Sequence, residues 1–148
     1  MSMYTYDTET SNDGDENAWI WSWALCDEEM DVKVGNGLDA LDVLLGLPDL
    51  SDVYVHNLPY DGEYLYWLLI RRGYVLVYGL NPFDAHHGCF DILADGGGII
   101  TMTIYTEGRR VTLHDSLRIF REPLRDLPRI CGFGDVTKGE LDYLTYRT

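Results

Sequence analysis

The chain has 148 residues, of which 46% are hydrophobic, and its formal net charge is −14 from 25 acidic and 11 basic residues. This length and hydrophobic content predict a single folded domain with its own core and argue against a disordered chain. The negative charge argues against a free-standing domain that binds DNA through a basic face, because most of the surface would repel phosphate.

Cysteine usage and hydropathy indicate the cellular compartment in which the protein folds. Cys26, Cys89 and Cys131 are odd in number and far apart, so they give no disulfide framework, and a reducing environment fits them best. His86 and His87 lie close to Cys89 but lack a matching second pair of metal ligands. The sequence shows no charged-then-apolar leader and no apolar run of membrane length, which predicts a soluble cytoplasmic protein.

Alternation of apolar and polar residues predicts strands in the first part of the chain. The expected strands are Met3–Asp7, Ala18–Cys26, Asp31–Val34 and Asp52–His56. The polar segment Ser11–Asn17 predicts the turn between the first two strands. Trp19, Trp21 and Trp23 follow a period of two, so we expect all three on one face of the second strand.

Helical spacing of leucines predicts two helices. The first covers Leu38–Leu45 and ends before Gly46 and Pro48, and the second covers Asp61–Arg72 with Gly73 just past its end. A short strand is expected over Val75–Tyr78, and Gly79–Gly98 is expected to be irregular.

The last elements complete a mixed pattern of strands and helices. Ile99–Thr106 and Arg110–His114 predict a hairpin that turns at Glu107-Gly108. Pro123–Ile130 predicts a short helix. This order predicts an α/β protein in which helices pack on a mixed sheet.

Carboxylates at two predicted strand ends suggest metal chemistry. Asp7 and Glu9 are two residues apart on a strand, so their side chains point to the same face, and Asp61 follows a later strand. Hard cations such as Mg²⁺ and Mn²⁺ prefer carboxylate oxygens, and a pair of them can drive phosphodiester hydrolysis. Taken singly, Asp7 and Glu9 also fit a polar strand edge, and Asp61 also fits a helix cap.

Polar and aromatic residues near these carboxylates fit contacts with a nucleic acid. Asn57 could hydrogen-bond a nucleotide and Tyr60 could stack on a base. Ser116 could hold a phosphate or a sugar, although Asp115–Leu117 also fits a turn or a helix start. Lys138 is an ordinary surface lysine, or it neutralises charge on a phosphate if it lies near the metal ions.

Together these segments resemble the 3′–5′ proofreading exonuclease domain of family B DNA polymerases, in particular the protein-primed branch of phages and mobile elements. The resemblance covers nearly the whole chain and keeps the family's motif order. It rests on Tyr6–Thr10 as the first motif, Tyr54–Gly62 as the second, Asp115–Phe120 as the Ser-Leu motif, and Thr137–Tyr143 as the lysine segment.

The resemblance implies a ribonuclease-H-like exonuclease fold over residues 1–148 and a role for each matching residue. It implies a catalytic set of Asp7, Glu9, Asp61 and Lys138, with the three carboxylates as ligands of two Mg²⁺ or Mn²⁺ ions. It also implies contacts to a single-stranded DNA end by Thr10, Asn57, Tyr60, Ser116 and Leu117.

The family's third motif, a tyrosine followed four residues later by aspartate, does not occur after Lys138. Neither Tyr143 nor Tyr146 is followed by an aspartate. We therefore expect a domain without the family's last helix and without a polymerase domain, weak or inactive alone. The alternative is a repurposed, non-catalytic acidic protein that mimics DNA and inhibits a basic nucleic-acid-binding complex of the host, as anti-CRISPR proteins do.

Overall fold

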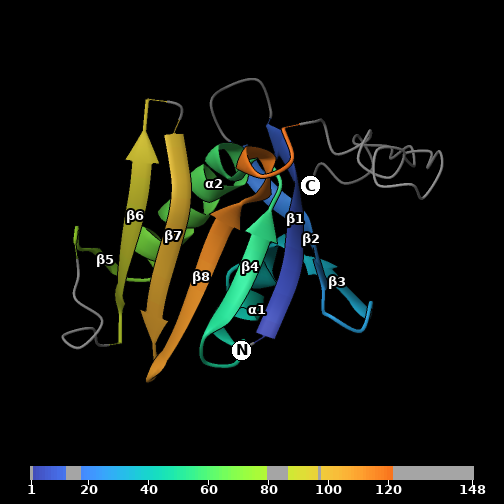
Figure 1. Ribbon diagram of the computed structural model, residues 1–148, viewed down its shortest axis with the longest axis horizontal. Coiled ribbons are helices and arrows are strands. Elements are labelled where there is room, and N and C mark those ends of the chain that lie inside the picture. Colours follow the sequence, from blue (N-terminus) through green and yellow to red (C-terminus); the bar gives the residue numbers. More distant parts are fainter. Residues whose placement is uncertain (1, 13–17, 80–86, 97, 122–148) are drawn as a thin grey trace.

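A computed structural model describes residues 2–12, 18–79, 87–96 and 98–121, and these form one mixed sheet with helices (Figure 1). The predicted helix Pro123–Ile130 lies outside these residues. The strands are β1 (Ser2–Asn12), β2 (Ala18–Cys26), β3 (Val32–Asn36), β4 (Ser51–Val55), β5 (Val75–Leu76), β6 (Cys89–Asp95), β7 (Gly98–Thr106) and β8 (Arg109–Asp115). The helices are α1 (Asp42–Leu45) and α2 (Leu58–Arg71), with 3₁₀ turns η1 (Gly37–Asp39) and η2 (Ser116–Arg118).

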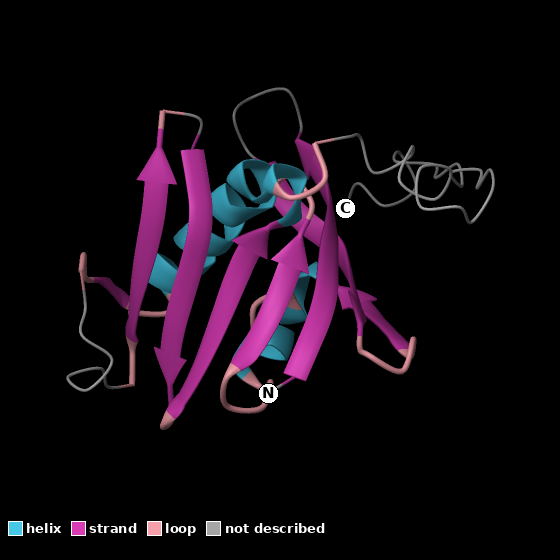
Figure 2. Ribbon diagram, in the orientation of Figure 1, coloured by secondary structure: helices cyan, strands magenta, loops and turns pink. Residues whose placement is uncertain are grey.

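The strand order across the sheet is β3-β2-β1-β4-β8-β7-β6-β5. Its centre is parallel, because β4 pairs in parallel with both β1 and β8, whereas β2, β3 and the β6–β7–β8 strands pair antiparallel. Both helices lie on the same face of the sheet, behind the strands in Figure 2. The predicted α/β class is therefore confirmed.

Alternation along the central strands builds the core between the sheet and α2. Val53 and Val55 of β4 are fully buried, and their neighbours on the strand are half-buried. Val111 and Leu113 of β8 repeat this pattern. The leucines of α2 that pack into the same cluster are Leu58, Leu65 and Leu69. Burying such side chains stabilises the fold by about 1.5–3 kcal/mol each.

Two predicted segments differ from the structure in kind, and the first predicted strand, Met3–Asp7, extends as β1 to Asn12. The region Gly79–Gly98, expected to be irregular, contains β6, whose Phe90 is fully buried and which pairs along its length with β7. The predicted helix Leu38–Leu45 is instead the 3₁₀ turn η1 followed by the short α1. Leu38 is exposed, so the helix packs only through its later leucines.

The expectation that Trp19, Trp21 and Trp23 share one face is wrong. The register shifts between Glu9 and Thr10, so that Trp23 pairs with Thr8 whereas Trp19 pairs with Ser11. Because Thr8 and Ser11 are three residues apart on β1, Trp19 and Trp23 lie on opposite faces. A β-bulge of this kind interrupts the period of two without any marker in the sequence.

We expect Gly37→Ala to destabilise the protein by about 2–4 kcal/mol, because a methyl group there would overlap the backbone carbonyl oxygen of Ile20 in β2. Urea unfolding measures this loss. Gly46→Ala is the control, since its added carbon would lie 3.4 Å from the Asp42 oxygen, an ordinary contact. Equal stability of the two variants would contradict the close approach at Gly37.

Candidate functional site

The candidate site lies where β1 runs past the end of β4. The parallel pairing of these strands extends only from Ser2 to Thr5 of β1, although β1 continues to Asn12. The chain leaves β4 at Val55 and enters α2 at Leu58, so the first turn of α2 stands beside the overhanging part of β1. Ligands of α/β proteins bind at such carboxyl ends of parallel strands.

Two side-chain hydrogen bonds join β1 to the first turn of α2. The hydroxyl of Thr8 donates to Oδ1 of Asp61 at 2.7 Å. Two residues further along β1, the hydroxyl oxygens of Thr10 and Tyr60 lie 2.6 Å apart. Tyr60 is half exposed, and its ring packs edge-on against that of Tyr64. The predicted DNA-contacting residues Thr10 and Tyr60 are thus brought together.

Asp61 is a buried carboxylate, with only 4% of its surface exposed. Burial raises the pKa of Asp61 from its ordinary 3.8 to about 7, and the hydrogen bond from Thr8 lowers it in part. The negative charges of Asp7 and Glu9 contribute smaller parts of this increase in pKa. Asp7 and Glu9 therefore each lie close enough to Asp61 for their charges to act on it.

Asp61 does not cap α2, which corrects the alternative interpretation of this residue. The helix begins earlier than predicted, at Leu58, and its N-cap is Asn57. Asp61 therefore lies inside the first turn. There its negative charge still interacts favourably with the positive end of the helix dipole.

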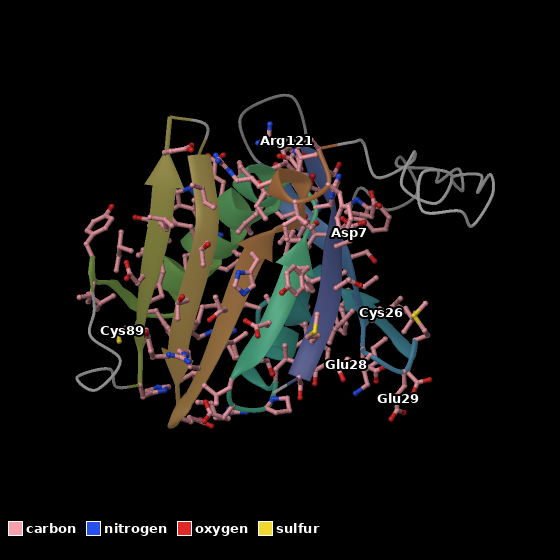
Figure 3. All side chains as sticks on the ribbon, in the orientation of Figure 1. Asp7, Cys26, Glu28, Glu29, Cys89 and Arg121 are labelled. Atoms are coloured by element: carbon pink, nitrogen blue, oxygen red, sulfur yellow. The ribbon has the colours of Figure 1, made fainter. Side chains whose placement is uncertain are left out.

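Side chains alternate along β1, so Asp7 and Glu9 lie on the face opposite to Thr8, the residue that contacts Asp61. Tyr6 and Thr8 are buried on the helix side, whereas Asp7 is exposed and Glu9 half-buried. Figure 3 shows Asp7 on the half of β1 that lies toward Arg121. The hydroxyl of Tyr6 donates to the Ala40 carbonyl at 2.7 Å, and burial together with the charges of Asp61 and Asp7 raises the pKa of Tyr6 well above its usual range.

The donor chemistry of these carboxylates fits a divalent cation, because Mg²⁺ and Mn²⁺ select oxygen ligands. Asp7 and Glu9 each repel the ionised form of Asp61, and a bound cation would relieve this repulsion. As placed, no three His, Cys, Asp or Glu side chains form a metal-binding group within the part of the chain that the structure describes. Lys138, the predicted catalytic lysine, lies outside that part.

A second set of contacts adjoins the same helix start. The backbone N–H groups of Asn57 and Leu58 donate to Oδ1 of Asp115, each at 3.1 Å, and the N–H of Leu117 donates to the same oxygen. Nδ1 of His56 lies 3.1 Å from the hydroxyl of Ser116. The predicted contacts Asn57, Ser116 and Leu117 therefore lie in adjoining segments.

Arg118 and Asp95 fix the far side of this junction. One guanidinium nitrogen of Arg118 lies 2.8 Å from each carboxylate oxygen of Asp95. This pair ties η2 to the end of β6. Neither residue was singled out from the sequence, because their pairing depends on β6, which the sequence did not predict.

Sequence reasoning also missed the structural roles of Thr8 and Asp115. The alternation of β1 was the available signal for Thr8, because the residue between Asp7 and Glu9 must point toward the helix side. Asp115 precedes η2 and caps it, which agrees with the turn or helix start weighed for that segment.

In metal-free protein, Asp61 should make stability depend on pH. Its folded-state pKa is raised, so the stability of the neutral form is present below about pH 4 and is lost as pH rises toward 7. Asp61→Asn should therefore be more stable than the parent at pH 8, by up to about 4 kcal/mol, and similar to it near pH 4. Urea unfolding in EDTA at both pH values measures the difference. Glu63→Gln, an exposed change in the same helix, is the control. An Asp61→Asn variant without any gain at pH 8 would contradict this electrostatic picture.

Comparisons with known proteins give one consistent relationship, although no protein-family model matches the chain. The DNA polymerases of Bacillus phages PZA and phi29 are each 24% identical over 148 aligned residues, which cover 95% of this chain. The chain spans about a quarter of the length of these relatives, 25% and 24% respectively.

No helix in the described residues is long and apolar enough to cross a membrane.

Solved structures show the same similarity. Phi29 DNA polymerase complexed with primer-template DNA matches 96% of this chain and 25% of its own, with a TM-score of 0.75 at 24% identity. Phi29 DNA polymerase complexed with single-stranded DNA matches 96% and 25%, with a TM-score of 0.76 at 23% identity. The predicted ribonuclease-H-like fold is thereby confirmed. The chain is homologous to the N-terminal quarter of phi29-type phage DNA polymerases, as its resemblance to the exonuclease domain of protein-primed family B polymerases predicted.

Proposed function

We propose that this chain is an exonuclease-like domain of a phage or mobile-element family B DNA polymerase, which acts on the 3′ end of single-stranded DNA. The observation that carries the proposal is the hydrogen bond from Thr8 to Asp61. It brings the second motif to the first, so that Asp61 interacts electrostatically with Asp7 and Glu9. A similar structure holds single-stranded DNA, which supports the choice of substrate.

Asp7, Glu9 and Asp61 would hold Mg²⁺ or Mn²⁺. When bound, such ions supply a nucleophilic water and stabilise the leaving oxygen of a phosphodiester. Thr8 holds the Asp61 carboxylate in place and leaves its second oxygen for a further partner. In this proposal Lys138 neutralises charge that builds on the phosphate.

The strand end would lie along the junction of β1, α2 and η2. Tyr60, half exposed, offers a ring on which a base can stack, and Thr10 fixes the position of its hydroxyl. Asn57 exposes its side chain at the start of α2. Ser116 and Leu117 contact the strand from the η2 side.

Hydrolysis by these 148 residues is proposed to be slow. No tyrosine after Lys138 is followed four residues later by an aspartate, so the sequence offers no match for the family's last metal ligand. Three carboxylates can still bind a cation and a strand end, but with fewer ligands to fix the geometry of the attacking water.

With Mn²⁺ and a 5′-labelled single strand, we expect slow shortening from the 3′ end that EDTA and Asp7→Ala both abolish. Gel analysis of the products, beside a complete family B polymerase, measures the rate. Asp39→Ala, an exposed carboxylate in η1, is the control and should retain the parent rate.

The outcomes of this assay separate the parts of the proposal. Cleavage at the rate of the complete enzyme, lost in Asp7→Ala, would contradict the defective site but keep the exonuclease. Absence of both cleavage and single-strand binding would contradict the exonuclease proposal itself.

The net charge of −14 favours a second candidate, an acidic inhibitor that mimics DNA. Glu28 and Glu29 lie exposed on the turn between β2 and the edge strand β3 (Figure 3). Carboxylates at a sheet edge could occupy a basic channel built for phosphates.

This candidate predicts that an equimolar amount of the chain inhibits a Cas9-type nuclease, and that about 0.5 M salt weakens the inhibition through screening. A DNA cleavage assay measures it. The joint change Glu28→Gln and Glu29→Gln should weaken inhibition, whereas Glu63→Gln should not. Undiminished cleavage at a large excess of the chain would contradict the inhibitor for that class of target.

A further inference from the structure

Asp115 joins two segments that no local sequence pattern links. It is the last residue of β8, and only 6% of its surface is exposed. Its Oδ1 accepts three backbone N–H groups, from Asn57 and Leu58 at the start of α2 and from Leu117 in η2, each at 3.1 Å. A single carboxylate oxygen therefore fixes the distance between these two segments.

The backbone at Asn57 explains why a carboxylate is needed. Asn57 adopts a left-handed conformation, with φ 66° and ψ 56°, and its side chain makes no hydrogen bond to the helix. This conformation turns the N–H groups of Asn57 and Leu58 toward the same point. Consecutive amides arranged in this way form a concavity that favours an anion, as does the start of a helix.

The strand register places Asp115 at this concavity. In the parallel pairing of β4 and β8, Asp115 stands beside Val55, which is the last residue of β4. The chain then passes through His56 to Asn57, whose N–H reaches the Asp115 carboxylate. Hydrogen bonds to a charged group contribute about 1.5–3 kcal/mol each, so three of them outweigh the cost of the left-handed residue.

We propose that Asp115 is a positioning residue for the DNA strand, holding Asn57–Tyr60 and Ser116–Leu117 at the separation that lets both contact one strand end. This inference rests on the proposed function. The resemblance assigns DNA contacts to residues on both sides of Asp115 but no role to Asp115 itself. In this proposal Asp115 does not contact the DNA itself and acts through the two segments that it holds.

The experiment compares Asp115→Asn with a matched control, Asp52→Asn. Asp52 is a half-buried carboxylate of β4, and its Oδ1 lies 2.8 Å from Nε2 of His114 on β8 rather than at the backbone of either segment. Both variants remove one charge and keep the side-chain shape. Fluorescence anisotropy with a dT oligonucleotide that ends in a phosphorothioate measures the Kd, with Mg²⁺ present.

Asp115→Asn should raise the Kd about tenfold or more, which corresponds to about 1.4 kcal/mol, whereas Asp52→Asn should leave it within about twofold. Amide hydrogen exchange gives a readout that does not depend on DNA. In Asp115→Asn the N–H groups of Asn57, Leu58 and Leu117 should lose protection together, while the core strand β4 keeps its protection.

Each outcome decides a different point. If the parent binds no oligonucleotide, the proposed function fails, and the inference fails with it. If the parent binds and Asp115→Asn binds equally well, only the inference is overturned. Should Asp115→Asn fail to fold, exchange in the parent decides, because the three N–H groups must open with one common free energy. Independent opening of Leu117 would overturn the inference.

Discussion

The parallel pairing of β1, β4 and β8 determines which residues can meet at one edge of the sheet. All three strands run in the same direction, but β4 ends at Val55 while β1 continues to Asn12. The gap that β4 leaves is filled by the first turn of α2. For this reason Thr8 and Asp61, which are 53 residues apart in sequence, lie within hydrogen-bond distance. Had β4 been longer, the polar part of β1 would pair with it and the carboxylate of α2 would lie elsewhere.

Burial of Asp61 near two other carboxylates is costly in a chain that already carries a net charge of −14. Within the residues that the structure describes, the hydroxyl of Thr8 and the start of α2 offset part of this cost. A divalent cation bound near Asp61 would offset this repulsion, because its positive charge stabilises the ionised form that Asp7 and Glu9 disfavour. The electrostatics of the metal-free site thus favour the proposed cation site.

Local patterns in the sequence predicted most of the elements but few of the contacts. The strand Ala18–Cys26 was predicted with the bounds that the structure has, and β4 and the β7–β8 hairpin within one residue at each end, because alternation and turn residues mark them. Strand β6 was missed because the glycines that follow it resemble a loop, although Asp95 at its end pairs with Gly98 at the start of β7. The bulge that separates Trp19 from Trp23 left no sequence signal. The early start of α2 did leave one, because asparagine is a common N-cap and proline is common in the first turn, but the prediction did not use Asn57 and Pro59 in this way. The motifs singled out Asp7, Glu9 and Asp61, and in the structure the charges of Asp7 and Glu9 act on Asp61. Two of the three donors to Asp115, however, lie 57 and 58 residues away and depend on the tertiary fold.

Two buried carboxylates at this edge of the sheet have opposite surroundings, and the difference indicates opposite roles. Asp115 faces three backbone donors, which compensate its charge and leave no demand for a further ligand. Asp61 faces one hydroxyl donor and the negative charges of Asp7 and Glu9, so its ionised form is poorly compensated. A compensated carboxylate stabilises one geometry of the chain, whereas an uncompensated one favours binding of a cation. The same side-chain chemistry therefore serves to hold the backbone at the end of β8 and, we propose, to bind the metal ion at the start of α2.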